Sequence, residues 1–255
     1  MKSKKIEFEN SEGYKLSARL DTPDSGDIVQ SALFAHCFTC GKNIRAAGNI
    51  SRALTNRNIA VFRFDFTGLG ESEGDFADST FSSDVSDLIS ASEKMQELTK
   101  PPAILIGHSL GGTAVLQAAK DILSARAVVT IGSPCSPEHV THHFDQDIDE
   151  IQAKGEATVK LAGRPFKVKK KFIDDLKEQQ MDKTIKELDK ALMIFHSPMD
   201  DTVSIDNAAR IYKLAKHPKS YISLDDADHL LAQEKDSNYV AEIIAVWAER
   251  YFCDN

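Results

Sequence analysis

Residues 107–111 read Gly107-His108-Ser109-Leu110-Gly111 and are followed by Gly112. This stretch fits the pattern Gly-x-Ser-x-Gly. A short apolar run at residues 103–106 precedes it and a helical pattern at 110–123 follows it, which predicts a strand, a sharp turn and a helix. Side chains at positions 107 and 111 would collide in so tight a turn, so both are glycine. Ser109 would stand at the carboxyl end of the strand, over the free N–H groups of the helix N-terminus.

Length and composition indicate one large α/β domain. The chain has 255 residues, of which 42% are hydrophobic and 27% are charged. Its formal net charge of −8 argues against nucleic acid or an anionic membrane as the main partner. No apolar stretch approaches the roughly 18 residues of a membrane span, and residues 6–10 alternate like a strand rather than a signal-peptide core. We therefore expect a cytoplasmic protein, and its oligomeric state stays open.

Apolar runs alternate with helical patterns along most of the chain. Residues 4–10 and 15–21 alternate apolar and polar side chains, which predicts an antiparallel hairpin at a sheet edge. Buried strands are expected at 32–35, 60–64, 103–106, 127–131, 192–195 and 221–224. Helices are expected at 43–56, 81–98, 110–123, 205–214 and 239–251. Strands that alternate with helices predict parallel crossovers and a doubly wound, mostly parallel sheet.

One segment interrupts this alternation, because no buried strand is predicted between residues 131 and 191. It contains a helical pattern at 147–154, a small hairpin at 157–161 and 165–169, and a helix at 172–187. We expect residues 136–189 to form a cap inserted within a single domain of residues 1–255. The cap would cover the carboxyl edge of the sheet, where open α/β sheets bind ligands. Its basic run at 167–171 is expected to be a solvated hairpin face, with an anion-binding patch as the alternative.

A serine hydroxyl becomes a useful nucleophile only beside a base, usually a histidine that a carboxylate orients. Of the eight histidines, His229 alone follows shortly after the last predicted strand, so we predict it as the base. Asp200 and Asp201 follow the strand at 192–195 and are the candidates for the acid. Both loops lie at carboxyl ends of parallel strands and can reach Ser109. The aspartates at 225, 226 and 228 are expected to form a solvated loop, because closeness in sequence does not place a carboxylate against Nδ1.

Four segments together resemble the α/β-hydrolase superfamily: residues 36–41, 65–74, 107–112 and 191–207. The resemblance extends over essentially the whole chain. Within that superfamily the chain is most similar to the hydrolase half of fusion proteins that carry an OsmC-like peroxidase domain. The chain ends at Asn255 without room for such a domain, so peroxidase activity is not expected.

The resemblance implies roles for individual residues. The turn after residue 195 resembles His-Gly-x-x-Asp-x-x-Val, and Asp200 occupies the aspartate position, which favours it over Asp201. The catalytic triad would be Ser109, Asp200 and His229. The oxyanion would be bound by the backbone N–H of Leu110, and by that of Phe38 in a loop that resembles His-Gly-x with cysteine in place of glycine. The Gly-rich turn at 65–74 would shape the floor around the nucleophile rather than bind phosphate.

Cys37 and Cys40 form a Cys-x-x-Cys in the same loop. A structural loop is the main expectation, and a regulatory thiol or disulfide and a metal site are the alternatives. Three further histidines at 139, 142 and 143 lie near two aspartates at 145 and 147, and we expect a solvated face there rather than metal ligands.

The sequence therefore predicts a serine hydrolase of the carboxylesterase kind, acting on a small-molecule ester or thioester with a small or medium acyl group. We expect no metal ion and no organic cofactor. A thioesterase, peptidase or acyltransferase on the same triad is one alternative. A non-catalytic or redox-linked binding module that uses Cys37 and Cys40 is another.

Overall fold

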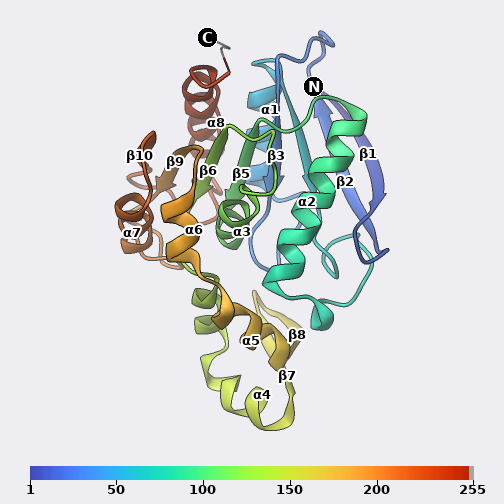
Figure 1. Ribbon diagram of the computed structural model, residues 1–255, viewed down its shortest axis with the longest axis vertical. Coiled ribbons are helices and arrows are strands. Elements are labelled where there is room, and N and C mark those ends of the chain that lie inside the picture. The colour runs from blue at the N-terminus through green and yellow to red at the C-terminus, as the bar shows by residue number, and fades with distance from the viewer. Residues whose placement is uncertain (253–255) are drawn as a thin grey trace.

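The computed structural model describes residues 1–252, which form one main sheet with helices on both faces (Figure 1). The strands are β1 Lys2–Glu9, β2 Lys15–Thr22, β3 Gln30–Ala35, β4 Ile59–Phe64, β5 Ile104–His108, β6 Ala127–Ile131, β7 Glu156–Leu161, β8 Arg164–Lys169, β9 Ala191–His196 and β10 Lys219–Ser223. The helices are α1 Arg45–Thr55, α2 Phe81–Leu98, α3 Leu110–Ala118, α4 Ile148–Lys154, α5 Lys170–Glu178, α6 Met181–Glu187, α7 Asp206–Leu214 and α8 Glu234–Glu249. Short 3₁₀ turns lie at η1 Phe76–Asp78, η2 Pro137–His143 and η3 Asp145–Asp147.

The main sheet has eight strands in the order β1-β2-β4-β3-β5-β6-β9-β10. β1 pairs antiparallel with β2, and β2 pairs antiparallel with β4. From β4 to β10 the neighbouring strands are parallel. The predicted doubly wound, mostly parallel sheet with an antiparallel N-terminal hairpin is therefore confirmed, and the carboxyl ends of its parallel strands meet at one edge.

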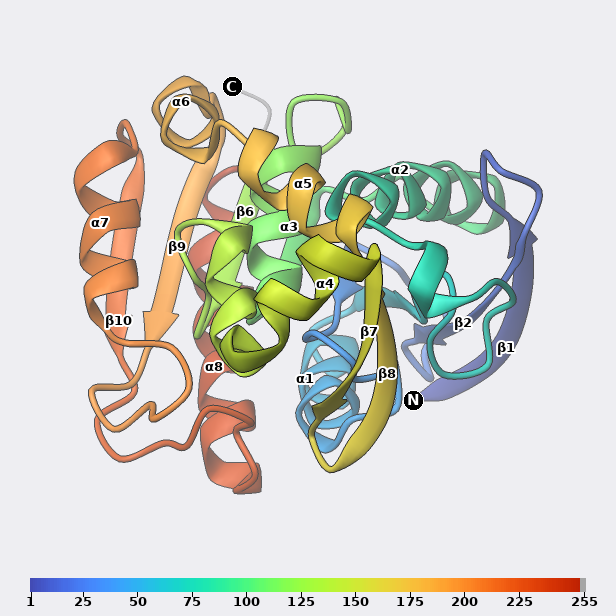
Figure 2. The same cartoon turned by 90° about the horizontal axis from the view of Figure 1, so that it is seen from below.

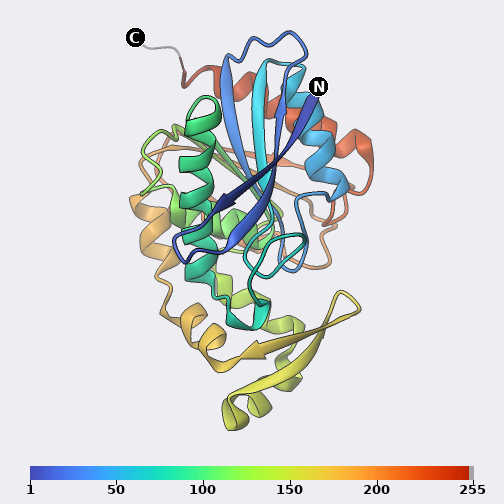
Figure 3. The same cartoon turned by 90° about the vertical axis from the view of Figure 1, so that its right-hand side faces the viewer.

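Two apolar layers fix the helices on the sheet. Helices α1 and α8 lie on one face of the sheet and α2 lies on the other (Figure 3). α2, α3 and α7 contribute buried side chains to that second face. β3 to β6 and β9 are buried along almost their whole length, as parallel strands covered on both faces should be. A rigid, buried sheet of this kind can hold the loops at its edge in defined positions.

The last strand differs from its prediction. The sequence predicts a buried strand at 221–224, but β10 lies at the edge of the sheet and its residues are half-buried or exposed. Tyr221 is 37% exposed, and the buried Leu224 lies beyond the end of the strand. An edge strand has a neighbour on one side only, which leaves its other side to solvent.

The segment at 136–189 contains the predicted hairpin, β7–β8, and the predicted helix α4. The single helix expected at 172–187 is wrong, because the chain breaks into α5 and α6 at Gln179, whose ψ of 125° is not helical. The break lets α5 pack on α2 and η2, while α6 turns toward α3 and α7. Among residues 1–252, no helix has the length and apolar content that a membrane span requires.

Candidate active site

Ser109 lies between β5 and α3 in a conformation that few residues adopt. Its φ is +54°, which is costly for a residue with a side chain. The flanking glycines make the turn possible. A Cβ at Gly107 would lie 2.2 Å from the carbonyl oxygen of Gly111, and a Cβ at Gly111 would lie 2.4 Å from that of His36. The sharp turn that the sequence predicts around Ser109 is present.

The end of β6 connects Ser109 to two other predicted site residues. The backbone N–H of Ser109 donates to the carbonyl of Ile131 at 2.8 Å. The next residue is Gly132, where a Cβ would lie 3.1 Å from Oδ2 of Asp200 and 3.4 Å from Nδ1 of His229. The aspartate and the histidine thus pack directly on the backbone that adjoins Ser109. Ser109 and His229 also line the same cleft.

Asp200 and His229 form a buried ion pair or hydrogen bond, with 2.8 Å between Oδ2 and Nδ1. The other carboxylate oxygen accepts the backbone N–H groups of Thr202 at 2.9 Å and Val203 at 2.8 Å. Burial alone would raise the pKa of Asp200, but the hydrogen bonds from His229, Val203 and Thr202 outweigh it and lower that pKa. The carboxylate is therefore held ionised and in a fixed orientation against the imidazole.

The other aspartates near these loops are not in that position. Asp201 is exposed, and its carboxylate accepts the hydroxyl of Thr202. Asp225, Asp226 and Asp228 are exposed as well, as predicted for a solvated loop. Asp226 pairs with Lys235 at 3.0 Å, and Asp228 accepts the backbone N–H of Ala232.

His108 is a neighbour of the site that sequence reasoning missed. Its Nε2 lies 2.6 Å from the backbone carbonyl of His229, so the Nε2–H tautomer donates there and fixes the loop that carries the base. Burial lowers the pKa of His108 to about 4, and the nearby His229 adds to the effect. The variable position of Gly-x-Ser-x-Gly gave no signal of this role, because the partner is a backbone group 121 residues away.

Two backbone N–H groups face no protein acceptor at this edge. Within residues 1–252, the N–H of Phe38 and the N–H of Leu110 have no hydrogen-bond partner. Leu110 is the first residue of α3, where helix N–H groups are free by geometry. Phe38 lies in the loop after β3 and lines the cleft with Ser109. Free donors beside a serine are what an oxyanion needs.

The loop that carries Phe38 is closed by a disulfide between Cys37 and Cys40, whose Cα atoms are 5.3 Å apart. The same turn has a backbone hydrogen bond from Cys40 N–H to the carbonyl of Cys37 at 3.1 Å. Nδ1 of His36 donates to that carbonyl at 2.8 Å. From the 136–189 segment, the guanidinium of Arg164 donates to the carbonyl of Thr39.

A buried ion pair holds the far end of this loop. Lys42 is 1% exposed, and its ammonium lies 2.5 Å from Asp65, whose other oxygen accepts the backbone N–H of Lys42 at 2.6 Å. The carboxylate of Glu71 lies 3.1 Å from the same ammonium of Lys42, and the hydrogen bond from Lys42 lowers the pKa of Glu71 to about 2. Gly70 leaves room for Asp65, because a Cβ there would lie 2.3 Å from the carboxylate. The sequence signalled the turn at 65–74 but not this ion pair.

The cleft itself has a volume of about 970 Å³. It is bounded by the loop after β3, the turn after β4 and the hairpin β7–β8, which crosses the edge of the sheet in Figure 2. Lys160, Arg164 and Phe166 of the hairpin line it together with Ser109. The four lysines at 167, 169, 170 and 171 instead form ion pairs with nearby carboxylates.

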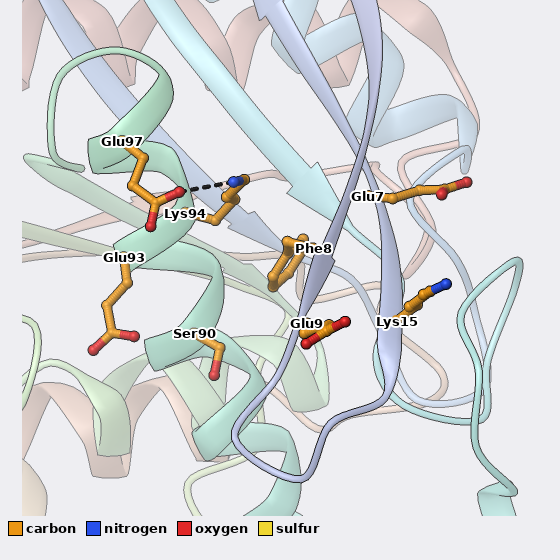
Figure 4. Close-up of a pocket in the computed structure, with 8 residues that line it drawn as sticks. All are labelled: Glu7, Phe8, Glu9, Lys15, Ser90, Glu93, Lys94 and Glu97. Atoms are coloured by element: carbon orange, nitrogen blue, oxygen red, sulfur yellow. Dashed lines mark hydrogen bonds and ion pairs between the residues drawn. The ribbon is translucent and has the colours of Figure 1, made fainter.

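A second hollow, of about 390 Å³, lies between β1, β2 and α2 (Figure 4). It is lined by Glu7, Phe8, Glu9, Lys15, Ser90, Glu93, Lys94 and Glu97. Its charged side chains belong to the surface of the hairpin and the helix, and Lys94 pairs with Glu97 at 2.7 Å within one turn of α2. None of the predicted site residues lies there.

No cluster of side chains within residues 1–252 has the composition and spacing of a metal site. The rings of His139 and His142 pack against each other, with centroids 5.0 Å apart. His143 lines the cleft, and burial lowers its pKa. His143 is exposed, as predicted for a solvated face, and it also stands at the cleft.

The sheet order, the turn at Ser109 and the buried Asp200–His229 pair at one edge define an α/β hydrolase. The chain belongs to the Hydrolase_4 family, serine aminopeptidase S33, which matches residues 40–171.

Comparison with solved structures and curated proteins agrees with this family. The chain is 45% identical to the esterase domain of a Rhodothermus marinus protein, with a TM-score of 0.80 over 98% of this chain and 99% of that one. It shares its fold with Est1E from Butyrivibrio proteoclasticus bound to ferulic acid, at 19% identity, a TM-score of 0.79 and coverage of 98% and 100%. It is 24% identical to YfhR of Salmonella typhi over 202 residues, 72% of this chain and 61% of that protein. The chain thus spans about 61% of the length of the YfhR relative that it matches.

Proposed function

We propose that this protein is a serine carboxylesterase that hydrolyses small or medium acyl esters through an acyl-enzyme. Ser109 is the nucleophile, His229 the general base and acid, and Asp200 the carboxylate that orients His229. The observation that carries the proposal is the 2.8 Å contact of Asp200 with His229, packed on Gly132 beside the backbone of Ser109. A serine, a histidine and a fixed carboxylate in this order are the parts that acyl transfer needs.

In the first half of the reaction, Oγ of Ser109 attacks the ester carbonyl and its proton passes to Nε2 of His229. The Nδ1 proton stays on the hydrogen bond to Asp200, which stabilises the imidazolium. The negative charge on the carbonyl oxygen is bound by the N–H groups of Phe38 and Leu110. His229 then protonates the leaving alcohol. In the second half, His229 activates a water molecule that releases the acid and restores Ser109.

The ester preference is supported by the Rhodothermus marinus protein, which is named an esterase domain and is 45% identical to this chain. A thioesterase is the second candidate, because residues of this chain are 32% identical over 104 positions to mouse palmitoyl-protein thioesterase ABHD10. The matching family is described as serine aminopeptidase, so amide substrates are tested as well. An acyltransferase would transfer the same acyl group to an acceptor other than water, and a non-catalytic, redox-linked module would turn over none of these substrates.

The test is a set of matched substrates that differ only in the bond cleaved and in acyl length. p-Nitrophenyl esters from acetate to decanoate, the corresponding acyl thioesters and an aminoacyl p-nitroanilide are assayed with the wild-type protein and with Ser109→Ala. We expect the highest kcat/KM on a short or medium oxygen ester and background rates for the variant. A higher kcat/KM on thioesters or anilides would transfer the proposal to that class, and equal rates in both proteins would reject Ser109.

Further parts of the proposal rest on sequence alone. We propose that residues 136–189 act as a cap over the cleft, that the protein works in the cytoplasm on a small molecule, and that its nearest subgroup is the hydrolase half of proteins fused to an OsmC-like domain. Removal of the β7–β8 hairpin with retention of fold and loss of acyl-length selectivity would support the cap.

A further inference from the structure

We propose that the Cys37–Cys40 disulfide is a positioning element of the oxyanion hole, and that its reduction slows acyl transfer while the fold and the triad stay in place. This inference rests on the proposed function, because it assigns Phe38 the role of oxyanion donor. The disulfide encloses that residue: Phe38 and Thr39 are the central residues of the turn that it closes. The two sulfur atoms therefore control the backbone on both sides of the donor.

The conformation inside the turn needs a constraint. Thr39 has a φ of +59°, and a β-branched residue rarely adopts this conformation. Such a residue costs of the order of 1–3 kcal/mol and persists only where the surroundings hold it. Within the turn, the hydrogen bond from Cys40 to Cys37 and the disulfide are the constraints. Without the covalent bond, rotation about Thr39 becomes easier and the hydrogen bond from the Cys40 N–H to the carbonyl of Cys37 weakens. That carbonyl belongs to the same peptide group as the Phe38 N–H, so the donor loses one of the contacts that orient it.

Contacts from outside the turn keep the loop attached to the protein in either redox state. Arg164 binds the carbonyl of Thr39, and His36 binds the carbonyl of Cys37. The ring of Phe38 stacks on that of Phe172, with centroids 5.8 Å apart. Because these contacts do not involve sulfur, we expect reduction to loosen the geometry of the donor rather than to unfold the domain.

The disulfide lies where a reductant can reach it. Both cysteines line the cleft, and Cys40 is partly exposed whereas Cys37 is 4% exposed. The thiolate of a dithiol reductant attacks the sulfur of Cys40 and forms a mixed disulfide, with the electron pair leaving on Cys37. The second thiol of the reductant then displaces Cys40. The protein gains two protons and two electrons as two thiols, and the reductant becomes a cyclic disulfide.

The size of the effect follows from the role of an oxyanion donor. Removal of one such donor typically lowers kcat by about 10²–10³. A donor that remains present but misplaced should lower it less, and we expect a fall of about 10-fold or more. The KM of a small ester should change little, because the donor acts on charge that develops in the transition state.

The test uses a Cys135→Ser/Cys253→Ser background, so that Cys37 and Cys40 are the remaining cysteines. The protein is equilibrated with oxidised or reduced dithiothreitol, and thiol counts confirm each state. kcat and KM are measured on a short p-nitrophenyl ester, together with the affinity for a trifluoromethyl ketone whose adduct carries an oxyanion. We expect kcat and the ketone affinity to fall together by about 10-fold or more on reduction and to recover on re-oxidation.

Circular dichroism and thermal melting decide whether a loss of activity reflects unfolding. The Cys40→Ala variant, which lacks the bridge without any reductant, should have the low kcat in both solutions. Equal kcat in the two thiol-counted states would overturn the inference, and so would a redox response that persists in Cys40→Ala. If the proposed function itself is wrong, the oxidised protein turns over no ester, which is a different result.

Discussion

Two hollows of this protein both contain lysine and glutamate side chains but differ in how the charged residues around them are held. In the hollow between the N-terminal hairpin and α2, lysines and glutamates stand on the molecular surface, and the Lys94–Glu97 pair lies within one helical turn (Figure 4). Beside the cleft at the carboxyl edge, the side chains of Asp200 and Lys42 are almost fully buried and bind the cleft residues His229 and Asp65 from distant segments. The difference shows that burial and convergence, rather than charge or concavity, mark the reactive site.

The architecture explains this difference. The loops after β3, β5, β6 and β9 all leave the sheet at one edge, so residues far apart in sequence meet there. The hollow beside the N-terminal hairpin is lined by surface residues of one helix, α2, and two strands, β1 and β2. Substitutions in the two hollows should therefore have effects of very different size.

The largest effect is expected from His229→Ala. The variant lacks the base, and loss of such a histidine lowers kcat by about 10⁶ in a serine hydrolase triad. Ester hydrolysis under saturating substrate measures it. The matched control is His142→Ala, an exposed histidine, which should keep the wild-type kcat. Comparable losses in both variants would contradict the assignment of the base.

Asp200→Asn should lower kcat by about 10⁴, because the amide favours the wrong tautomer of His229. Asp201→Asn is the matched control one residue away, where the side chain is exposed, and its kcat should stay within about twofold of wild type. A large loss of kcat in Asp201→Asn with little loss in Asp200→Asn would show that Asp201, rather than Asp200, orients His229.

Asp65→Asn should reduce the free energy of unfolding by about 3 kcal/mol or more. The substitution leaves the ammonium of Lys42 buried beside a neutral amide, with Glu71 as its remaining anion. Urea unfolding at neutral pH measures the change. A loss below about 1 kcal/mol would mean that Glu71 and solvent compensate the charge.

Stability should also fall in acid because of His108. Its pKa in the folded protein is about 4, below the ordinary value of 6.5, so the unfolded chain binds a proton that the folded protein excludes. The contribution is complete above pH 6.5 and is lost as the pH falls toward 4, by on the order of 3 kcal/mol. His108→Gln keeps an N–H donor but does not titrate. Its unfolding free energy should therefore fall less than that of wild type between pH 7 and pH 4, and equal falls would reject the assignment.

Glu97→Gln, in the other hollow, should have the smallest effect. It removes a surface ion pair with Lys94, which contributes at most about 0.5 kcal/mol. We expect unchanged kcat and an unfolding free energy within about 0.5 kcal/mol of wild type. A substantial loss of activity would show that this hollow has a function of its own.

The sequence predicted most of the scaffold, because buried strands and amphipathic helices leave local patterns. Errors fell where tertiary contacts decide. β10 was expected to be buried but is an edge strand, and the break at Gln179 reflects packing of α5 and α6 on different partners. α8 begins at Glu234 rather than near residue 239, because its polar first turn carries no apolar periodicity.

The site was predictable to the extent that its residues follow strand ends. Ser109, Asp200 and His229 each lie shortly after a parallel strand, so motif and topology together bring them to one edge. The contacts that hold these three residues and their loops in place have no recognisable pattern in the sequence. His108 donates to a backbone carbonyl, and Lys42 forms a buried ion pair with Asp65. Arg164 donates to the carbonyl of Thr39 from the separate β7–β8 hairpin. These contacts depend on three-dimensional proximity that spacing does not encode.

A fluorophosphonate probe tests whether Ser109 is an activated nucleophile. Probe-labelled protein is digested and the modified peptide is identified by mass spectrometry. We predict one label per folded chain, attached to Ser109, with no labelling of Ser109→Ala or of heat-unfolded protein. Labelling of Ser109→Ala at the wild-type rate, or a label on another residue, would contradict the role of Ser109 as the nucleophile.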